Sequence, residues 1–340
     1  MRTDTSFHQT MGRRRCMRTI LILGAGVLAG AGYSFNTEAA MPTTKVVIVK
    51  TTDRAKGIET AMAHFDLKNF RGASVAIKAN YNSADPFPAS THPDTLRAVI
   101  QGIKNSGAGP LTLAERSGMG DTRTVLETTE ASTIAEELGV KVVILDDLPD
   151  EDFITYEPKE SHWKRGFLLA CPFVEANMVV QTCCLKTHQY GGHFTLSLKN
   201  AVGAIAKNGP KDNYNYMSEL HNSSRQRSLA AEISLVFRND LIILDGMKAF
   251  VTGGPHSGKE VAPDVIVAGT DPVAVDAVGV AILRMYGTTP EVSEGKIFDQ
   301  EQIKRAAELG IGVTSFEAIE LIPVGHGADE FARQVKEQFK

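Results

Sequence analysis

Ser74-Val75-Ala76-Ile77-Lys78 opens the stretch of sequence that decides the fold, and Leu111-Thr112-Leu113-Ala114 closes it. Both runs are short and mainly apolar, as is typical of buried strands. Between them, residues 93–105 carry apolar side chains at helical spacing, with Pro93 at the first helical position. A strand, a helix and a second strand in this order predict a right-handed βαβ unit with parallel strands.

The same alternation continues on both sides of this unit. Further strands are predicted at residues 45–50, 140–145, 178–182, 241–245 and 265–268, and further helices at 54–66, 123–138, 228–238, 272–286, 301–309 and 328–339. This order predicts an α/β fold with a mainly parallel sheet built from βαβ units, as one elaborated domain or two intimately joined lobes. The expected domain spans 41–340, with a core at 44–287 and helices within 299–340. Ligands bind such sheets at the carboxyl ends of the strands, where the polar loops 79–82, 115–121 and 146–147 are expected.

The first 40 residues have the features of an export signal. Gly12-Arg13-Arg14-Arg15-Cys16-Met17-Arg18 is strongly basic and precedes a short, glycine-containing apolar stretch at 19–32. The pattern resembles a degenerate twin-arginine signal, and Ala39 or Ala40 suits the position before a cleavage site. We therefore expect a periplasmic or otherwise exported protein that uses the twin-arginine export machinery. The alternative is an uncleaved membrane anchor.

Composition narrows the classes of partner. The chain of 340 residues has 36 Lys and Arg against 40 Asp and Glu, a net charge of −4. Removing the five arginines and two acidic residues of the first 40 positions from these totals leaves −7 for the rest. An acidic body argues against nucleic acid as a partner. No later stretch reaches the ~18 apolar residues of a membrane span.

The densest group of chemically active side chains follows the strand predicted at 178–182. Lys186 and Lys199 are candidates to hold a small anion such as a carboxylate or phosphate. His188 is a candidate general acid or base, because imidazole titrates near neutral pH. The other candidate ligand-binding residues are Asn80, Thr187, Ser197, Asn200, Asp245 and Asp276, of which Ser197 is also expected to cap a helix. The alternative is a set of surface lysines and hydrogen-bonded loop histidines.

Cysteines raise the question of a metal. With His188 or His193, Cys183 and Cys184 could ligate iron, zinc or an iron–sulfur cluster. Alternatively, one of the two could pair with Cys171 in an oxidising compartment, or both could be small core residues. The sequence therefore leaves open whether the protein binds a metal ion or an iron–sulfur cluster.

Five motifs lie along the chain in a characteristic order. They are Lys78-Ala79-Asn80, Leu185-Lys186-Thr187-His188, Ser197-Leu198-Lys199-Asn200-Ala201-Val202-Gly203, Gly254-Pro255 and Asp271-Pro272-Val273-Ala274-Val275-Asp276-Ala277. Over roughly residues 44–287, the chain resembles the domain-of-unknown-function family numbered 362. The resemblance implies the α/β fold and a site at these motifs. It also implies a link to iron–sulfur modules, which members often accompany, although this chain lacks their cysteine module.

Three functions agree with these observations. The first is an exported enzyme that acts on a small anionic metabolite, with Lys186 and Lys199 holding the anion and His188 moving a proton. In this hypothesis a metal or redox cofactor is optional. The alternatives are an iron–sulfur or metal-binding redox protein and a non-catalytic solute-binding protein.

Overall fold

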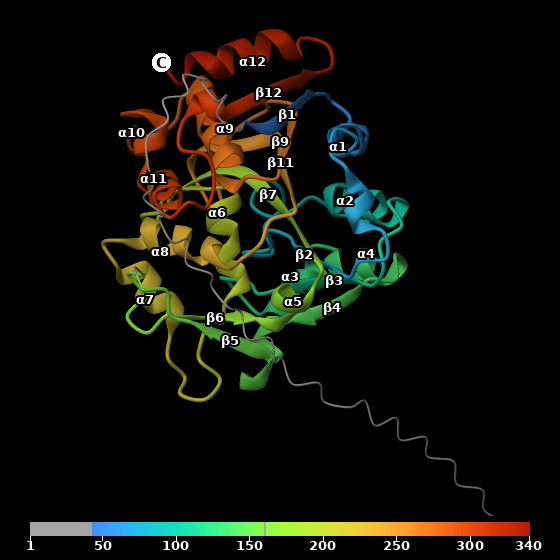
Figure 1. Ribbon diagram of the computed structural model, residues 1–340, viewed down its shortest axis with the longest axis vertical. Helices are drawn as coiled ribbons and strands as arrows, with labels where there is room; N and C mark the ends of the chain where they lie inside the picture. Colours follow the sequence, from blue (N-terminus) through green and yellow to red (C-terminus); the bar gives the residue numbers. More distant parts are fainter. Residues whose placement is uncertain (1–42, 160) are drawn as a thin grey trace, which may run out of the picture. The chain divides into compact units, whose positions relative to one another are not determined.

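A computed structural model describes residues 43–159 and 161–340, so the predicted export signal lies outside the described residues. The strands are β1 (Thr44–Lys50), β2 (Val75–Lys78), β3 (Leu111–Glu115), β4 (Lys141–Ile144), β5 (Phe153–Tyr156), β6 (Phe167–Ala170), β7 (Met178–His188), β8 (His193–Thr195), β9 (Leu241–Gly253), β10 (Gly258–Val261), β11 (Val265–Gly269) and β12 (Ile319–Val324). In the described part of the chain, ten of them form one sheet, whose main path runs β12-β1-β11-β9-β7-β2-β3-β4 (Figure 1). β8 pairs with β7 and β10 with β9, whereas β5 and β6 form a separate pair.

The sheet is mainly parallel, as the sequence predicts. β9, β7, β2, β3 and β4 are successive parallel neighbours, and β12 runs parallel to β1. β11 is antiparallel to both of its neighbours, β1 and β9. The α/β fold built from βαβ units is therefore confirmed.

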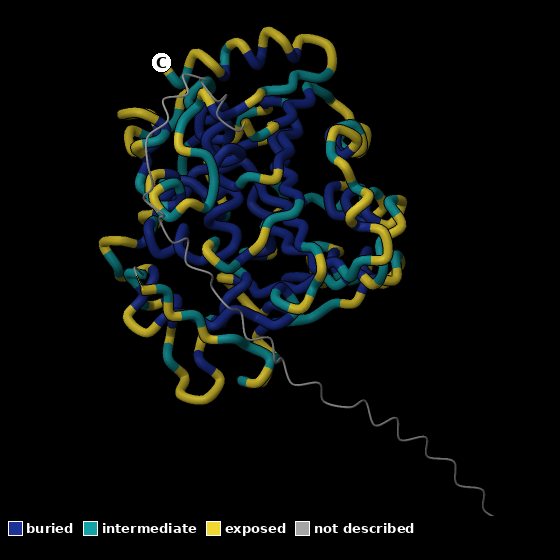
Figure 2. Tube along the Cα trace, in the orientation of Figure 1, coloured by how far each residue is buried: buried dark blue, intermediate teal, exposed yellow. Residues whose placement is uncertain are grey.

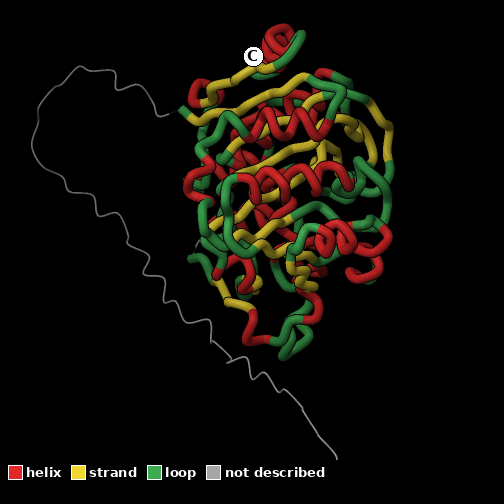
Figure 3. Tube along the Cα trace, turned by 90° about the vertical axis from the view of Figure 1, so that its right-hand side faces the viewer, coloured by secondary structure: helices red, strands yellow, loops and turns green. Residues whose placement is uncertain are grey.

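Helices cover both faces of the sheet. They are α1 (Arg54–Met62), α2 (Pro93–Asn105), α3 (Thr122–Thr128), α4 (Ala131–Glu137), α5 (Cys171–Glu175), α6 (Ser197–Asn200), α7 (Tyr216–Asn222), α8 (Gln226–Glu232), α9 (Pro272–Met285), α10 (Pro290–Ser293), α11 (Glu301–Glu308) and α12 (Ala328–Glu337). Side chains alternate along β1, so Val46 and Ile48 join the core beneath α9, whereas Val47 and Val49 join the core beneath α1 and α2. Figure 3, in which the side of α1 and α2 faces the viewer, shows helices lying in front of the strands. Figure 2 shows the buried residues gathered between these layers.

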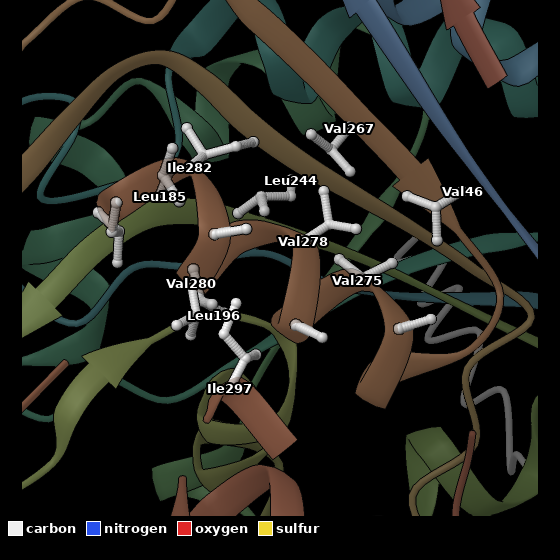
Figure 4. Packing of buried hydrophobic residues seen from close by; sticks show 14 of the residues in the cluster. Val46, Leu185, Leu196, Leu244, Val267, Val275, Val278, Val280, Ile282 and Ile297 are labelled. Atoms are coloured by element: carbon white, nitrogen blue, oxygen red, sulfur yellow. The ribbon is translucent and has the colours of Figure 1, made fainter. Parts of the chain in front are cut away.

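The helix α9 lies within this core, and its sequence explains why it begins at Pro272. The Asp271 side chain accepts hydrogen bonds from the backbone N–H groups of Val273 and Ala274, and Pro272 needs no partner at the first helical position. Every residue of the helix from Pro272 to Leu283 is buried. Val275, Val278 and Ile282 lie among side chains of the sheet and of neighbouring segments (Figure 4).

Three features depart from the sequence prediction. The helix predicted at 123–138 is two helices, because Glu130 takes a left-handed backbone with φ 61° and ends the regular pattern between α3 and α4. The strands predicted at 178–182 and 241–245 continue to His188 and Gly253. The strands β5, β6, β8, β10 and β12 were not predicted. Within the described residues, no helix combines the length and hydrophobicity needed to cross a bilayer.

Candidate functional site

A cavity of about 200 Å³ opens at the carboxyl ends of β2, β3 and β7. These strands are parallel and adjacent in the sheet, so their ends meet at one edge. This is the edge where ligands bind in parallel α/β sheets. Its polar lining includes Asn80, Arg116, Lys186, His188, Lys199 and Asn200.

Lys186 is held in place by a buried amide network. The strand β7 carries it to the cavity, and its side chain is fully buried. Its ammonium group donates to Oδ1 of Asn80 at 2.6 Å and to the backbone carbonyl of Ala89. Asn80 donates in turn to Oδ1 of Asn200 at 3.0 Å. Burial lowers the pKa of Lys186.

Arg116 follows the last residue of β3 and is also buried. Its guanidinium group donates to the backbone carbonyls of Ile205 at 3.0 Å and Val202 at 2.6 Å, and it contacts the sulfur of Met217. These partners orient the side chain but supply no negative charge. Burial lowers the pKa of Arg116.

Lys199 comes from α6 and lies beside a glycine that leaves room for it. A side chain at Gly192 would come within 2.8 Å of both the His188 ring and Cε of Lys199. Only 7% of Lys199 is exposed, and its ammonium group has no hydrogen-bond or ion-pair partner among the described residues. Burial, followed by repulsion from Arg116, lowers its pKa from 10.5 to about 8.

The electrostatic character of the cavity follows from these three side chains. Arg116, Lys186 and Lys199 all line it, and within the described residues none of them forms an ion pair. The nearby buried carboxylate of Glu115 is already bound to Lys78, with Nζ and Oε2 2.7 Å apart. The lining therefore carries an excess of positive charge although the chain as a whole is acidic, and Asp146 and Asp85 act on Arg116 and Lys186 without forming ion pairs with them.

Lys78 and Glu115 lie directly beneath the cavity wall. A side chain at the lining residue Gly203 would come within 2.8 Å of the Lys78 ammonium group. Burial lowers the pKa of Lys78 and raises the pKa of Glu115 to about 7. Their mutual hydrogen bond offsets part of the cost of burying both groups.

Two histidines line the cavity, and both favour the neutral form. Burial, together with the positive charge of Lys199, lowers the pKa of His188 to about 2. His221, at the mouth, also has a lowered pKa. Its Nδ1 lies 2.7 Å from the backbone carbonyl of Met217, which can only accept, so Nδ1 carries the hydrogen and Nε2 is free to accept.

The structure divides the residues that sequence predicted for the site. Asn80, Lys186, His188, Lys199 and Asn200 meet at the cavity. The remaining four, Thr187, Ser197, Asp245 and Asp276, are absent from its lining.

These four residues have structural partners instead. Thr187 donates to the backbone of β9 at Phe250. Asp245 accepts from Arg54 at 2.9 Å and from Thr95. Asp276 accepts hydrogen bonds from the backbone N–H and the hydroxyl group of Ser197, so the predicted cap of α6 is supplied by α9 and not by Ser197 itself.

The four candidate metal ligands do not form a single group. Cys183 and Cys184 are neighbours on β7 and face opposite sides of the sheet; Cys183 lies in the apolar core beneath α9. Neither forms a disulfide, and burial raises the pKa of Cys184 to about 12, which disfavours the thiolate. Only the two histidines are cross-strand neighbours, because His193 on β8 pairs with His188 on β7. Across residues 43–159 and 161–340, no group of three or more His, Cys, Asp or Glu side chains is placed to hold a metal ion.

Sequence reasoning missed several lining residues. Arg116 and Asn82 belong to loops that were expected at this edge, and Pro255 to a quoted motif, but none was singled out. Met217 and His221 come from α7, in a segment without clear periodicity, so no signal pointed to them.

The fold and the cavity define an α/β protein with a positively charged site at the carboxyl edge of its sheet. The chain belongs to the family described as Domain of unknown function (DUF362), whose profile matches residues 75–281, more than half of the chain. The match is narrower than the 44–287 expected from the motifs, yet it includes every residue that lines the cavity.

Two known proteins share part of the chain. The thylakoid-associated protein sll1697 of Synechocystis sp. is 24% identical over 199 residues, which are 58% of this chain and 59% of that protein. The chain thus spans less than two thirds of that relative's length. The lactate racemase apoprotein from Thermoanaerobacterium thermosaccharolyticum superposes with a TM-score of 0.43 and 15% identity, over 70% of this chain and 57% of that one. A likeness at this level carries no argument about function.

Proposed function

We propose that the chain is an exported enzyme that binds a small organic anion through Arg116, Lys186 and Lys199 and exchanges a proton with it. One observation carries the proposal: three buried cations line a single cavity, and none has a carboxylate partner among the described residues. Burying an unpaired cation costs several kcal/mol. An anion in the cavity would offset that cost for all three at once.

Lys199 is the best candidate for the proton-transferring group. A general acid or base works best when its pKa lies near the operating pH, and the pKa of Lys199 is about 8. His188, with a pKa of about 2, stays neutral and is suited to a hydrogen bond with the bound anion. The proposal therefore moves the proton-transfer role from His188, where sequence reasoning put it, to Lys199.

Small anions are expected to stabilise the protein against heat. Malonate or phosphate at about 100 times its Kd should add about 2.7 kcal/mol, which is a rise in Tm of roughly 5 °C for a chain of this size. Lys186→Met should lose most of this rise, because it removes one buried charge and keeps the volume. The measurement is differential scanning fluorimetry, with choline chloride as the control salt and the exposed Lys45→Met as the matched variant. Equal shifts in Lys186→Met and Lys45→Met would contradict the proposed site.

A second measurement on the same samples distinguishes an enzyme from a solute-binding protein. This test is needed because three cations would bind an anion equally well in either kind of protein. Proton exchange by Lys199 should replace the methylene hydrogens of bound malonate with deuterium faster than buffer alone, as followed by proton NMR in D₂O. Binding without accelerated exchange of any anion that stabilises the protein would favour the non-catalytic alternative.

Export is the second part of the proposal, and it rests on the sequence of residues 1–40. Changing both Arg13 and Arg14 to Lys should leave the full-length precursor in the cytoplasm, because the arginine pair is what the export machinery would read. Cell fractionation and the mass of the exported form measure this. Arg2→Lys is the control, and it should leave export and cleavage near Ala39 or Ala40 unchanged. An undiminished exported form in the double variant would rule out the twin-arginine route.

A further inference from the structure

The rim of the cavity differs in character from its interior. In the described part of the chain, three large hydrophobic side chains are exposed, namely Met119 at 43%, Tyr190 at 54% and Leu235 at 36%. Met119 directly follows the lining residue Gly118, and Tyr190 lies two positions beyond the lining residue His188. Exposed apolar side chains scattered singly are ordinary. Here, two of the three belong to segments that also contribute lining residues to one cationic cavity.

Tyr190 connects two segments that line the cavity. Its ring stacks on the His256 ring with centroids 6.0 Å apart and planes at 12°. It also meets the His188 ring edge to face, with centroids 5.9 Å apart. His188 lines the cavity, and His256 directly follows the lining residue Pro255. The Tyr190 ring therefore lies at the outer edge of the site.

The turn that carries Tyr190 is fixed at both ends. The Arg227 side chain donates to the backbone carbonyl of Gly191 at 2.6 Å, and the backbone N–H of Gln189 donates to the carbonyl of Gly254 at 3.3 Å. Tyr190 is thus exposed on a braced turn. A rigid aromatic side chain of this kind offers contact area at low entropic cost.

Met119 is held to the loop that follows β2. Its backbone N–H donates to the carbonyl of Asn82 at 2.8 Å, and Asn82 lines the cavity. Methionine side chains adapt readily to the shape of an apolar or aromatic group. Tyr190 is therefore held through its ring to the lining residue His188, and Met119 through its backbone to the lining residue Asn82.

The interior of the cavity is suited to a polar ligand. His188 is 8% exposed and lines the cavity, and its Nδ1 is buried without a hydrogen-bond partner among the described residues. Three unpaired cations surround the same space. A ligand that suits both interior and rim must carry a charged head and an apolar tail.

We propose that the site takes an organic anion that carries a ring-sized apolar group, with the anionic head among Arg116, Lys186 and Lys199 and the ring against Tyr190 and Met119. This inference rests on the proposed function and names the class of its substrate. Tyr190 and Met119 then determine specificity, whereas the cations determine affinity for the charge.

Malonate and phenylmalonate test the proposal, because they share one dianionic head and differ only by a ring. Isothermal titration calorimetry on the full chain is expected to give about tenfold tighter binding of phenylmalonate, from burial of part of the ring. Tyr190→Ala and Met119→Ala should each reduce this ratio severalfold and leave malonate affinity unchanged. Leu235→Ala, which removes the third exposed apolar side chain, should change neither affinity.

The outcomes separate the two proposals. Equal affinity for the two anions, or a tenfold ratio that survives in the Tyr190→Ala, Met119→Ala double variant, overturns the ring subsite and leaves the anion site standing. Failure of both anions to bind overturns the anion site and the ring subsite together. Unfolding midpoints of the variants, measured alongside, should match the wild type because both side chains are exposed.

Discussion

Replacing Lys199 with methionine is expected to stabilise the ligand-free protein and to weaken its binding of small anions by about 100-fold. Burial lowers the pKa of this lysine from 10.5 to about 8, and at 1.36 kcal/mol per pKa unit its charge costs the folded state about 3 kcal/mol. Methionine keeps most of the volume without the charge. A hydrogen bond from a charged group contributes about 1.5–3 kcal/mol, so its loss accounts for the weaker binding. Urea unfolding and calorimetric titration with malonate measure the two effects.

The pH dependence of stability provides an independent check of the same variant. Between pH 8 and 10.5 the unfolded chain holds the proton of Lys199 more tightly than the folded protein does, so wild-type stability should rise with pH across this window. The advantage of Lys199→Met should therefore be complete below pH 8 and shrink as the pH approaches 10.5. Lys259→Met, at an exposed position of β10, should show neither effect. A destabilised Lys199→Met would mean that the ammonium group already has a partner.

Asp276→Ala is expected to be among the most destabilising single substitutions in the chain, at about 4 kcal/mol or roughly 8 °C in Tm. The Asp276 carboxylate accepts from the backbone N–H groups of Ser197 at 2.7 Å and Leu198 at 3.2 Å, and from the Ser197 hydroxyl. Alanine would leave these buried donors unpaired. Because α6 also carries Lys199, the variant should lose anion binding even where it remains folded.

Asp276→Asn separates the structural from the positioning role. Asparagine retains one acceptor oxygen, so it should recover part of the stability and part of the malonate affinity in parallel. Asp299→Ala, at an exposed position, should leave both unchanged. Wild-type malonate affinity in folded Asp276→Ala would show that α6 keeps Lys199 in place without this cap.

Local sequence patterns predicted most of the fold because they have local causes. The helix α2 matches its predicted bounds, since Pro93 and the stripe of Leu96, Val99, Ile100 and Ile103 act within a few turns. The strand β12 was missed because only Ile319 of its six residues is buried and Pro323 interrupts its apolar pattern. The break between α3 and α4 depends on the left-handed backbone of a single residue, Glu130. The spacing of apolar residues along the sequence does not predict a backbone conformation of this kind.

The site was predictable where its residues belong to the polar cluster around β7 or follow β2, and Lys199 and Asn200 of α6 were found in that cluster. Lys186, His188 and Asn80 stand at strand ends, so the topology rule for parallel sheets pointed to them. Thr187 shares the same strand, yet the alternation of side chains turns it toward the backbone of β9. His221 comes from α7, whose approach to the cavity depends on tertiary packing alone.

The pairing of β1 with β12 also constrains when the protein can fold. Val46 lies opposite Leu321 in this parallel pair, so a strand near the start of the chain finds its neighbour only near the end. Contacts of such long sequence separation form slowly, because a large loop must close first. During synthesis, β1 must wait for β12 to leave the ribosome. This edge of the sheet is therefore completed only after β12 has been synthesised, and a chain cut short before β12 would present β1 as an open edge for aggregation.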